Sequence, residues 1–254
     1  MLSIVIPTYN EEKYLPLLLR SIEAQDFSDY EIIVADAHST DTTRQIAVAT
    51  GARVVDGGMP GPGRNRGAEV ATGEVILFLD ADVVLSDPSF LRATVDEFTR
   101  RKLGIATCKM SALSDKKIDK VFHEAFNYFM WVTSAVVPHA PGFCIFVEAE
   151  VHRAIGGFDE TIQFAEDHDY AMRASKVKKF GLLKTSRIPV SVRRFDRDGR
   201  FTIAIKYLFS ELYMRTKGGI RSDVLKYRFG HDDNGTVSSI KKKSYGKNTS
   251  RKNE

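Results

Sequence analysis

The sequence contains little cysteine and no long apolar segment, and each shortage excludes a class of protein. Its two cysteines, Cys108 and Cys144, stand apart without the spacing of metal ligands. We expect them to pack as small apolar groups in a reducing compartment rather than to form a disulfide. The longest apolar candidate, residues 126–137, is shorter than a membrane span and is interrupted by polar residues. No signal peptide is expected, because residues 1–3 lead directly into a strand pattern.

The chain also has little excess charge. Apolar residues make up 43% of its 254 residues and charged residues 28%, as in a soluble globular protein, and the formal net charge is +4. This charge permits anionic ligands but gives no indication of a nucleic acid partner. Much of the excess lies in residues 231–254, which we expect to form a basic, disordered tail. Attraction of this tail to an anionic membrane surface and a plain solvated terminus both stay open.

The first half of the chain alternates between strand and helix patterns. Short apolar runs predict strands at residues 2–7, 31–35, 53–55 and 75–79. Helical spacing predicts helices at residues 11–25, 41–48, 64–71 and 88–101, the second of them capped by Ser39 or Thr40. This order predicts an α/β fold with a doubly wound, mostly parallel sheet flanked by helices.

The second half is less regular. Strands are predicted at residues 104–113, 142–148 and 188–193, and helices at 115–137, 151–155 and 167–179. The helix over 115–137 is rich in aromatic residues, which favours a place in the core or at a dimer face over a membrane-facing entrance. We expect residues 201–230 to form an amphipathic helical extension. We expect one domain over residues 1–200, with halves 1–113 and 114–200.

The tripeptide Asp80-Ala81-Asp82 follows an apolar run, residues 75–79. Such a run, without polar alternation, is typical of a strand buried on both faces. Open α/β sheets bind their ligands at the carboxyl ends of their strands. Carboxylates at such a place are suited to Mg²⁺ or Mn²⁺, which share oxygen ligands with substrate phosphates. The alternative is a turn with two solvated aspartates.

Further polar sites follow or lie near the other predicted strand ends. They are Pro7-Thr8-Tyr9-Asn10-Glu11, Asp36 with residues 38–41, and residues 61–67, which contain Arg64. The sites after the strands at 2–7, 31–35 and 75–79 should converge in one crevice. There Tyr9 could stack on a base, Asp36 could accept from base or ribose, and Arg64 could pair with a diphosphate. Helix capping, an Asx turn and surface charge are the structural alternatives.

Three carboxylates crowd the predicted start of the helix at 167–179: Glu166, Asp167 and Asp169. The helix dipole stabilises anions there, which is a sufficient structural reason for them. Like charges in close contact would instead raise at least one pKa toward a value useful for a general base.

At this point the chain resembles family 2 glycosyltransferases, nucleotide-diphospho-sugar transferases with the GT-A fold. The resemblance covers roughly residues 1–195. The matching segments are residues 4–11, 39–41, 64–65, 73–74, 78–82, 156–160 and 166–167. The chain lacks the Gly-rich fingerprints of rival nucleotide-binding folds. The resemblance implies a metal-dependent, inverting transfer of a sugar to an acceptor, with a lipid-linked, polysaccharide or glycoconjugate acceptor as options.

The resemblance also implies a role for each matching residue. Pro7, Tyr9, Glu11 and Asp36 would line the nucleoside pocket, with Arg64 on the nucleotide side. Asp80 would approach the ribose or sugar and assist Asp82, the main ligand of Mg²⁺ or Mn²⁺. The Gly156–Glu160 segment would shape the acceptor side. Asp167 would be the catalytic base, with Glu166 beside it.

One departure and one basic segment qualify this assignment. Ala37 and His38 stand where the family commonly has a second acidic residue, so the nucleotide base stays open. Arg193 and Arg194, with Arg197 and Arg200, would form a mobile loop that closes on a diphosphate or an acceptor phosphate, or else a solvated loop with local ion pairs.

Two rival functions remain. A sugar-phosphate nucleotidyltransferase would be expected to carry a Gly-rich phosphate loop after the first strand, where this chain has residues 7–10. A non-catalytic binding protein with the same fold has no reason to keep Asp82 and Asp167. We expect a cytoplasmic protein, with peripheral contact to the membrane through the C-terminal region as an option. The sequence indicates neither the donor sugar nor the oligomeric state.

Overall fold

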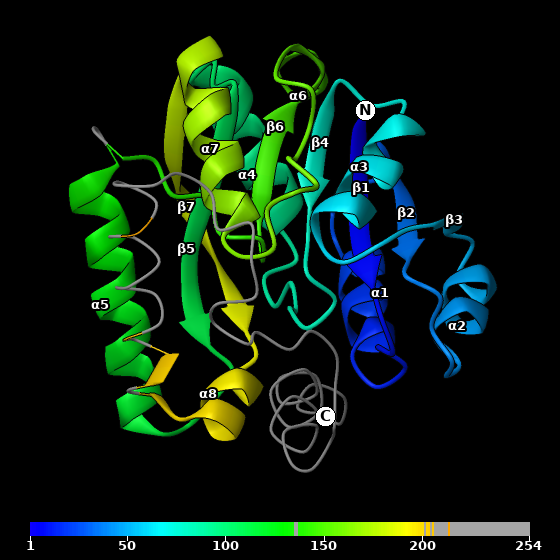
Figure 1. The fold of residues 1–254 in the computed structure, drawn as a ribbon, viewed down its shortest axis with the longest axis horizontal. Helices are drawn as coiled ribbons and strands as arrows, with labels where there is room; N and C mark the ends of the chain where they lie inside the picture. Colours follow the sequence, from blue (N-terminus) through cyan, green and yellow to red (C-terminus); the bar gives the residue numbers. More distant parts are fainter. Residues whose placement is uncertain (135–136, 201, 204, 206–212, 214–254) are drawn as a thin grey trace, which may run out of the picture.

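The computed structural model describes residues 1–134, 137–200, 202, 203, 205 and 213. One seven-stranded sheet forms its centre, in the order β3-β2-β1-β4-β6-β5-β7 (Figure 1). The strands are β1 (Leu2–Thr8), β2 (Tyr30–Asp36), β3 (Arg53–Asp56), β4 (Val75–Phe78), β5 (Ile105–Ala112), β6 (Ile145–Glu148) and β7 (Phe180–Val190). All neighbours pair in parallel except β6, which runs antiparallel to β4 and β5.

Helices flank this sheet and connect its strands. They are α1 (Leu15–Glu23), α2 (Thr43–Ala49), α3 (Gly61–Glu69), α4 (Phe90–Arg100), α5 (Lys117–Thr133), α6 (Ala149–Ala154), α7 (Glu166–Val177) and α8 (Arg193–Asp198). None of the helices in the described residues combines the length and apolarity that crossing a membrane requires.

Alternation along β1 explains the two layers of the core. Leu2, Ile4 and Ile6 point to the face covered by α1 and α4, where they join one apolar cluster. Val5 points to the opposite face and joins Phe78 and residues of α6 and α7. Both faces of β1 are buried, and its middle, Ile4-Val5-Ile6, is apolar without alternation, as is typical of a central parallel strand. The α/β prediction is confirmed.

Several local predictions were wrong. Helix α2 begins at Thr43 with no side-chain cap, because Ser39 bonds Asp36 and Asn10 instead. Strand β7 starts at Phe180 rather than residue 188, and its last predicted residue, Arg193, opens helix α8. The basic segment at 193–200 is therefore largely helical rather than a loop. The amphipathic extension and the basic tail lie outside the described residues apart from 202, 203, 205 and 213.

Helix α5 turns a polar face inward and an apolar face outward. Its buried residues are Asp119, His123, Asn127 and Met130. Asn127 bonds the backbone of Met110 in β5, so the inward polar groups are satisfied. Its exposed side carries Ile118, Val121, Tyr128, Phe129, Trp131 and Val132. Of the two places predicted for this aromatic helix, the core is wrong and the dimer face stays a prediction. Helix α5 lies at the edge of the molecule beside β5 (Figure 1).

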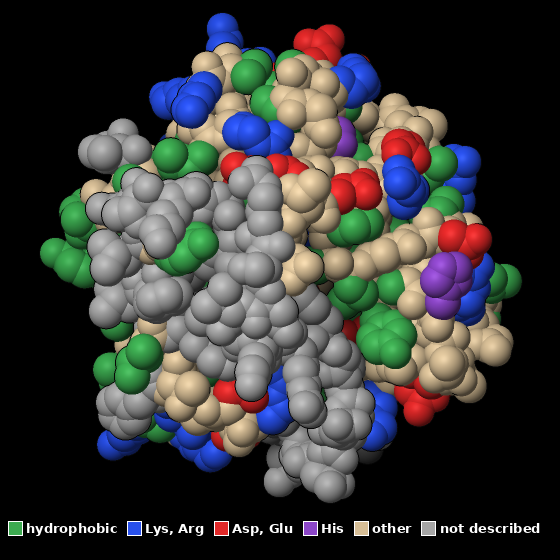
Figure 2. Space-filling model, viewed as in Figure 1, with side chains coloured by type: hydrophobic (Ala, Val, Ile, Leu, Met, Phe, Trp, Pro, Cys, Tyr) green, Lys and Arg blue, Asp and Glu red, His purple; other side chains and the backbone are tan. Residues whose placement is uncertain are grey.

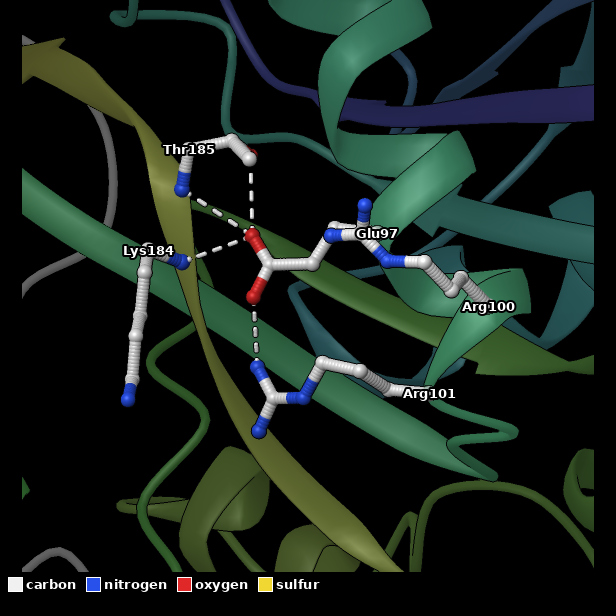
Figure 3. Close-up of a pocket in the computed structure, with 5 residues that line it drawn as sticks. All are labelled: Glu97, Arg100, Arg101, Lys184 and Thr185. Atoms are coloured by element: carbon white, nitrogen blue, oxygen red, sulfur yellow. Dashed lines mark hydrogen bonds and ion pairs between the residues drawn. The ribbon is translucent and has the colours of Figure 1, made fainter.

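A bulge in β7 depends on one buried carboxylate from α4. The register between β5 and β7 shifts after Cys108, which leaves the amides of Lys184 and Thr185 without strand partners. The Glu97 carboxylate accepts from both amides, at 2.8 and 2.9 Å, and from the Arg101 guanidinium at 2.6 Å (Figure 3). These residues, with Arg100, line a hollow of about 400 Å³ on this flank of the sheet.

We predict that Glu97→Gln destabilises the fold, because one amide oxygen cannot replace a carboxylate that accepts from two backbone amides and a guanidinium. The expected loss is about 2 kcal/mol in urea unfolding at pH 7. Burial raises the pKa of Glu97, but the hydrogen bonds from Lys184, Thr185 and Arg101 outweigh it and hold the pKa below its usual value. The contribution is therefore present above the unfolded pKa of about 4.3 and fades as the pH falls below it. Exposed Asp96→Asn on the same helix is the control, and an equal loss there would contradict this role.

Candidate functional site

The carboxyl ends of β1 and β2 meet as the sequence predicts. Thr8 and Asp36 are register partners, and the Thr8 hydroxyl donates to the Asp36 carboxylate at 3.0 Å. Beyond the strands, the Asn10 amide donates to Ser39 Oγ at 2.9 Å, and the Thr40 amide donates to Asn10 Oδ1 at 2.9 Å. The two loops thus form one surface at this edge of the sheet.

Asp36 supports this surface from beneath. It is fully buried, and it accepts from the Ser39 amide and hydroxyl as well as from Thr8. Arg44 adds an ion pair at 3.3 Å. A carboxylate so enclosed orders the loop after β2, whereas the half-buried Tyr9 is open to solvent. Pro7 is also buried, within β1.

Arg64 of α3 joins the carboxylate after β4 to the first turn of α7. Its Nη2 donates to Asp80 at 2.9 Å and its Nη1 donates to Glu166 at 2.7 Å. The Arg64 side chain is 3% exposed, that of Glu166 8% and that of Asp80 31%. The Arg64 Cζ also lies 5.3 Å from the centre of the Phe158 ring. Arg64 is thus committed to two carboxylates inside the protein, rather than free to face a diphosphate as predicted.

Glu166 is a buried carboxylate with a raised pKa. Burial, and then the charge of Asp167, raise its pKa to about 7, while Arg64 acts in the opposite direction. Asp167 is half-buried and is held by backbone amides: Gly142 donates to its Oδ2 and His168 to its Oδ1, both at 2.8 Å. The two neighbours therefore differ, Glu166 being buried against Arg64 and Asp167 being half-buried and oriented by two backbone amides.

Asp82 shares a guanidinium with Glu11. Arg193 Nε lies 3.0 Å from Asp82 Oδ2, and Arg193 Nη2 lies 3.2 Å from Glu11 Oε1. The Arg193 Cζ lies over the Tyr14 ring, 4.5 Å from the ring centre. The sequence predicts Asp82, Glu11 and Arg193 as separate site residues, and the structure places them in contact. Tyr14 lies in the segment predicted as a helix at residues 11–25 and is not among the predicted site residues.

The other arginines of the basic segment lie elsewhere. Arg194 lies in α8. Arg197 pairs with Asp198, and Arg200 donates to the buried Asp119 of α5 at 2.6 Å. Arg200 therefore fastens the segment after α8 to α5 rather than facing the strand-end edge.

The strand-end edge offers oxygen ligands for a hard cation. A cationic group already lies against Asp82 and Glu11, so the two carboxylates converge on a position that accepts positive charge. No group of three His, Cys, Asp or Glu side chains within the described ranges forms a preformed cage. A Mg²⁺ or Mn²⁺ ion held by Asp82 would therefore need further ligands from substrate phosphates and water, which suits these ions.

Comparison with known proteins decides the family. The sequence model described as "Glycosyl transferase family 2" matches residues 3–145, more than half of the chain. The chain belongs to glycosyl transferase family 2. This match includes most of β1, all of β2 and β4, and both aspartates after β4, whereas residues 156–160 and 166–167 lie beyond it.

Two curated relatives illustrate the similarity. Over 185 residues the chain is 29% identical to the poly(ribitol-phosphate) beta-N-acetylglucosaminyltransferase TarS of Staphylococcus aureus, covering 68% of this chain and 32% of that protein. Over 92 residues it is 35% identical to the GalNAc(5)-diNAcBac-PP-undecaprenol beta-1,3-glucosyltransferase of Campylobacter jejuni, covering 32% of this chain and 29% of that protein. The chain spans about a third of the length of these curated relatives.

Solved structures share the fold. The mannosyltransferase PcManGT from Pyrobaculum calidifontis, in complex with GDP-Man and Mn²⁺, superposes with a TM-score of 0.67 at 19% identity, over 85% of this chain and 70% of that one. Residues 1–349 of S. aureus TarS in complex with UDP-GlcNAc give a TM-score of 0.62 at 23% identity, over 75% and 58% of the two chains. The likeness confirms the predicted GT-A architecture.

We predict that Arg64→Met destabilises the fold by about 3–5 kcal/mol, because it leaves the Glu166 carboxylate buried without its cation. Arg64 lowers the pKa of Glu166, so its loss raises that pKa further above the unfolded value of about 4.3. A raised carboxyl pKa makes stability fall as the pH rises between the unfolded and folded values. Urea unfolding should therefore show a larger loss at pH 8 than at pH 5.5.

The control for this variant is Arg66→Met, two residues further along α3. Arg66 is 46% exposed and pairs with Glu69 on the surface, so its loss should change stability by less than about 0.5 kcal/mol. If Arg64→Met lowers the stability equally at pH 5.5 and pH 8, the coupling to Glu166 is contradicted.

Proposed function

We propose that this chain is a metal-dependent, inverting glycosyltransferase that moves a sugar from a nucleotide-diphospho-sugar to an acceptor. One observation carries the proposal: Arg64 holds Asp80, after β4, against the Glu166-Asp167 pair of α7. Donor-side and acceptor-side carboxylates of the family motifs are therefore neighbours at one edge of the sheet, where open α/β folds bind ligands.

The donor would lie across the ends of β1, β2 and β4. Tyr9, which is half-buried, can stack on the nucleotide base. Asp80, the more exposed partner of Arg64, can accept from ribose or sugar hydroxyls. Asp82 would hold Mg²⁺ or Mn²⁺, and the ion would neutralise the charge that develops on the departing diphosphate.

Arg193 is the residue that must respond to donor binding. Its guanidinium lies on Asp82 and Glu11, so a metal ion on Asp82 and the guanidinium compete for one carboxylate. Once displaced, a cation on the short helix α8 would be near the diphosphate. This role agrees with the phosphate-binding role predicted for Arg193. It adds that Arg193 is paired with Asp82 and Glu11 before the donor binds.

Asp167 is the proposed general base. Its two oxygens each accept one backbone amide, and each keeps a lone pair for the proton of an acceptor hydroxyl. The deprotonated hydroxyl would attack the donor sugar from the side opposite the diphosphate, which inverts the configuration. Glu166, buried on Arg64, would orient the pair rather than take the proton. With an anionic acceptor, Asp167 would position rather than abstract.

The acceptor proposal follows the relatives by class. The S. aureus relative is named for poly(ribitol-phosphate) and the C. jejuni relative for an undecaprenol-linked glycan. The outward apolar side of α5, with Tyr128 at 66% and Trp131 at 56% exposure, suits contact with a membrane surface where a lipid-linked acceptor is held. Basic and acidic side chains intersperse over the described part of the face in Figure 2. A cytoplasmic protein in peripheral contact with the membrane fits this acceptor class.

Donor binding is the direct test. Thermal unfolding should be measured with UDP-GlcNAc, GDP-mannose and dTDP-glucose, each with and without MnCl₂. We expect one donor to raise the midpoint in the presence of Mn²⁺, since a ligand at 100 times its Kd stabilises by about 2.7 kcal/mol. Asp82→Asn should fold normally but lose the part of the donor-induced rise in the unfolding midpoint that depends on Mn²⁺. An unchanged Mn²⁺ effect in Asp82→Asn would refute the metal assignment, and no shift with any donor would count against the function.

The base is tested by Asp167→Asn. Asparagine keeps the size of the side chain but cannot take the proton, so we expect turnover to fall by about 10²–10⁴-fold while the Kd for the donor with Mn²⁺ changes little. Steady-state release of the nucleoside diphosphate and calorimetry measure the two quantities. Asp169→Asn, in the same turn of α7, is the control. Unchanged turnover in Asp167→Asn would indicate an anionic acceptor or another base.

A further inference from the structure

We propose that Gly142 is a positioning residue of the transfer reaction, a role that rests on the proposed function. Gly142 lies in the turn before β6, closed by a hydrogen bond from the Cys144 amide to the Pro141 carbonyl at 3.0 Å. Its amide orients Asp167, and its missing side chain leaves the room that the Arg64 guanidinium needs to reach Asp80. One residue thus sets both the acceptor-side and the donor-side carboxylate.

The amide contact fixes the orientation of Asp167. Gly142 donates to Asp167 Oδ2 at 2.8 Å across a sequence separation of 25 residues, while the local His168 amide holds Oδ1. The His168 bond alone comes from the helix that carries Asp167. The bond from Gly142 ties that carboxylate to the turn before β6 and so to the sheet.

The missing side chain matters because Arg64 passes directly beside Gly142. An ideal Cβ on residue 142 would lie 3.1 Å from Arg64 Cζ and closer still to Nη2. Nη2 is the nitrogen that donates to Asp80, whereas Nη1 holds Glu166. A methyl group at this position would therefore disturb the Asp80 half of the guanidinium fork first.

Arg64 cannot move aside without losing its partners. Its side chain is 3% exposed and packs over the Phe158 ring. Gly142 itself is buried but is not among the residues with positive φ. Alanine therefore suits its backbone, and the consequence of Gly142→Ala falls on the contact with Arg64 rather than on backbone strain.

The first experiment needs no substrate. Urea unfolding compares wild type, Gly142→Ala, Arg64→Lys and the double variant. Lysine has one nitrogen in place of the guanidinium fork, so the methyl group would have no Nη2 to displace. We expect Gly142→Ala to lower the folding equilibrium constant at least tenfold in the wild-type background and much less in the Arg64→Lys background. An equal loss in both backgrounds would overturn the proposal.

The second experiment separates positioning from general damage. With Mn²⁺ and the donor that stabilises the wild type, we expect Gly142→Ala to lower kcat for nucleotide release about 10²-fold, the order that a misplaced reactive group costs. The Kd for the nucleoside diphosphate of that donor, measured with Mn²⁺, should change at least ten times less than kcat. Equal losses in both, or a wild-type kcat, would overturn the proposal.

Gly61→Ala is the matched control. A Cβ on residue 61 would meet Glu166 Cγ and Phe158 Cβ at 3.6 Å, an ordinary contact beside the same carboxylate. This variant should keep both kcat and stability near wild type. A wild-type chain that releases no nucleotide from any donor would refute the proposed function, and the unfolding comparison would then decide the contact between Gly142 and Arg64 by itself.

Discussion

The site depends on one buried cation, the Arg64 guanidinium. Two carboxylates from distant parts of the chain, Asp80 and Glu166, can approach each other only because this guanidinium lies between them. Burying such a group is costly unless it is paired and hydrogen-bonded, and it is strongly destabilising to remove one partner. The same ion pairs therefore hold β4, α3 and α7 together and bring the proposed donor and acceptor groups within reach of each other.

A second cation repeats this pattern at the neighbouring aspartate. Arg193 connects the end of β7 to Asp82 and Glu11, so the strand-end edge is crossed by two arginines, each shared between two carboxylates. The difference lies in burial. The Arg64 side chain is 3% exposed and that of Arg193 is 19% exposed. Arg64 is suited to permanent structure, whereas the proposed function has the more exposed Arg193 exchange with a metal ion or a diphosphate.

The sequence predicted the order of strands and helices in the first half because each buried strand there is a short apolar run bounded by turn residues. It missed the start of β7, where residues 184–186 bulge out of the pairing and Glu97 of α4 supplies the missing acceptors. Those contacts join residues 87 and 88 positions apart and leave no local pattern. The inverted burial of α5 was missed for a related reason, since Asp119 and Asn127 are satisfied by Arg200 and Met110.

For the site, the sequence predicts Asp80, Asp82, Glu166 and Asp167, since carboxylates at strand and helix ends form a recognisable sequence pattern. The partners of those carboxylates form no such pattern. The local sequence predicts that Arg64 faces a diphosphate and that Gly142 begins a strand. The actual surroundings of Arg64 and of Gly142 depend on the antiparallel strand β6, because the turn before β6 brings Gly142 against Arg64 of α3. The tertiary arrangement, and not the local sequence, decides whether an arginine faces a ligand or a buried carboxylate.

A crystal structure of the chain with Mn²⁺ and a nucleoside diphosphate would test the central claim most directly. The account predicts Mn²⁺ on Asp82, the Arg193 guanidinium moved away from that carboxylate, and the Arg64 pairs with Asp80 and Glu166 unchanged. Mn²⁺ bound elsewhere while Arg193 stays on Asp82, or a nucleotide phosphate bound by Arg64 in place of Asp80, would contradict it.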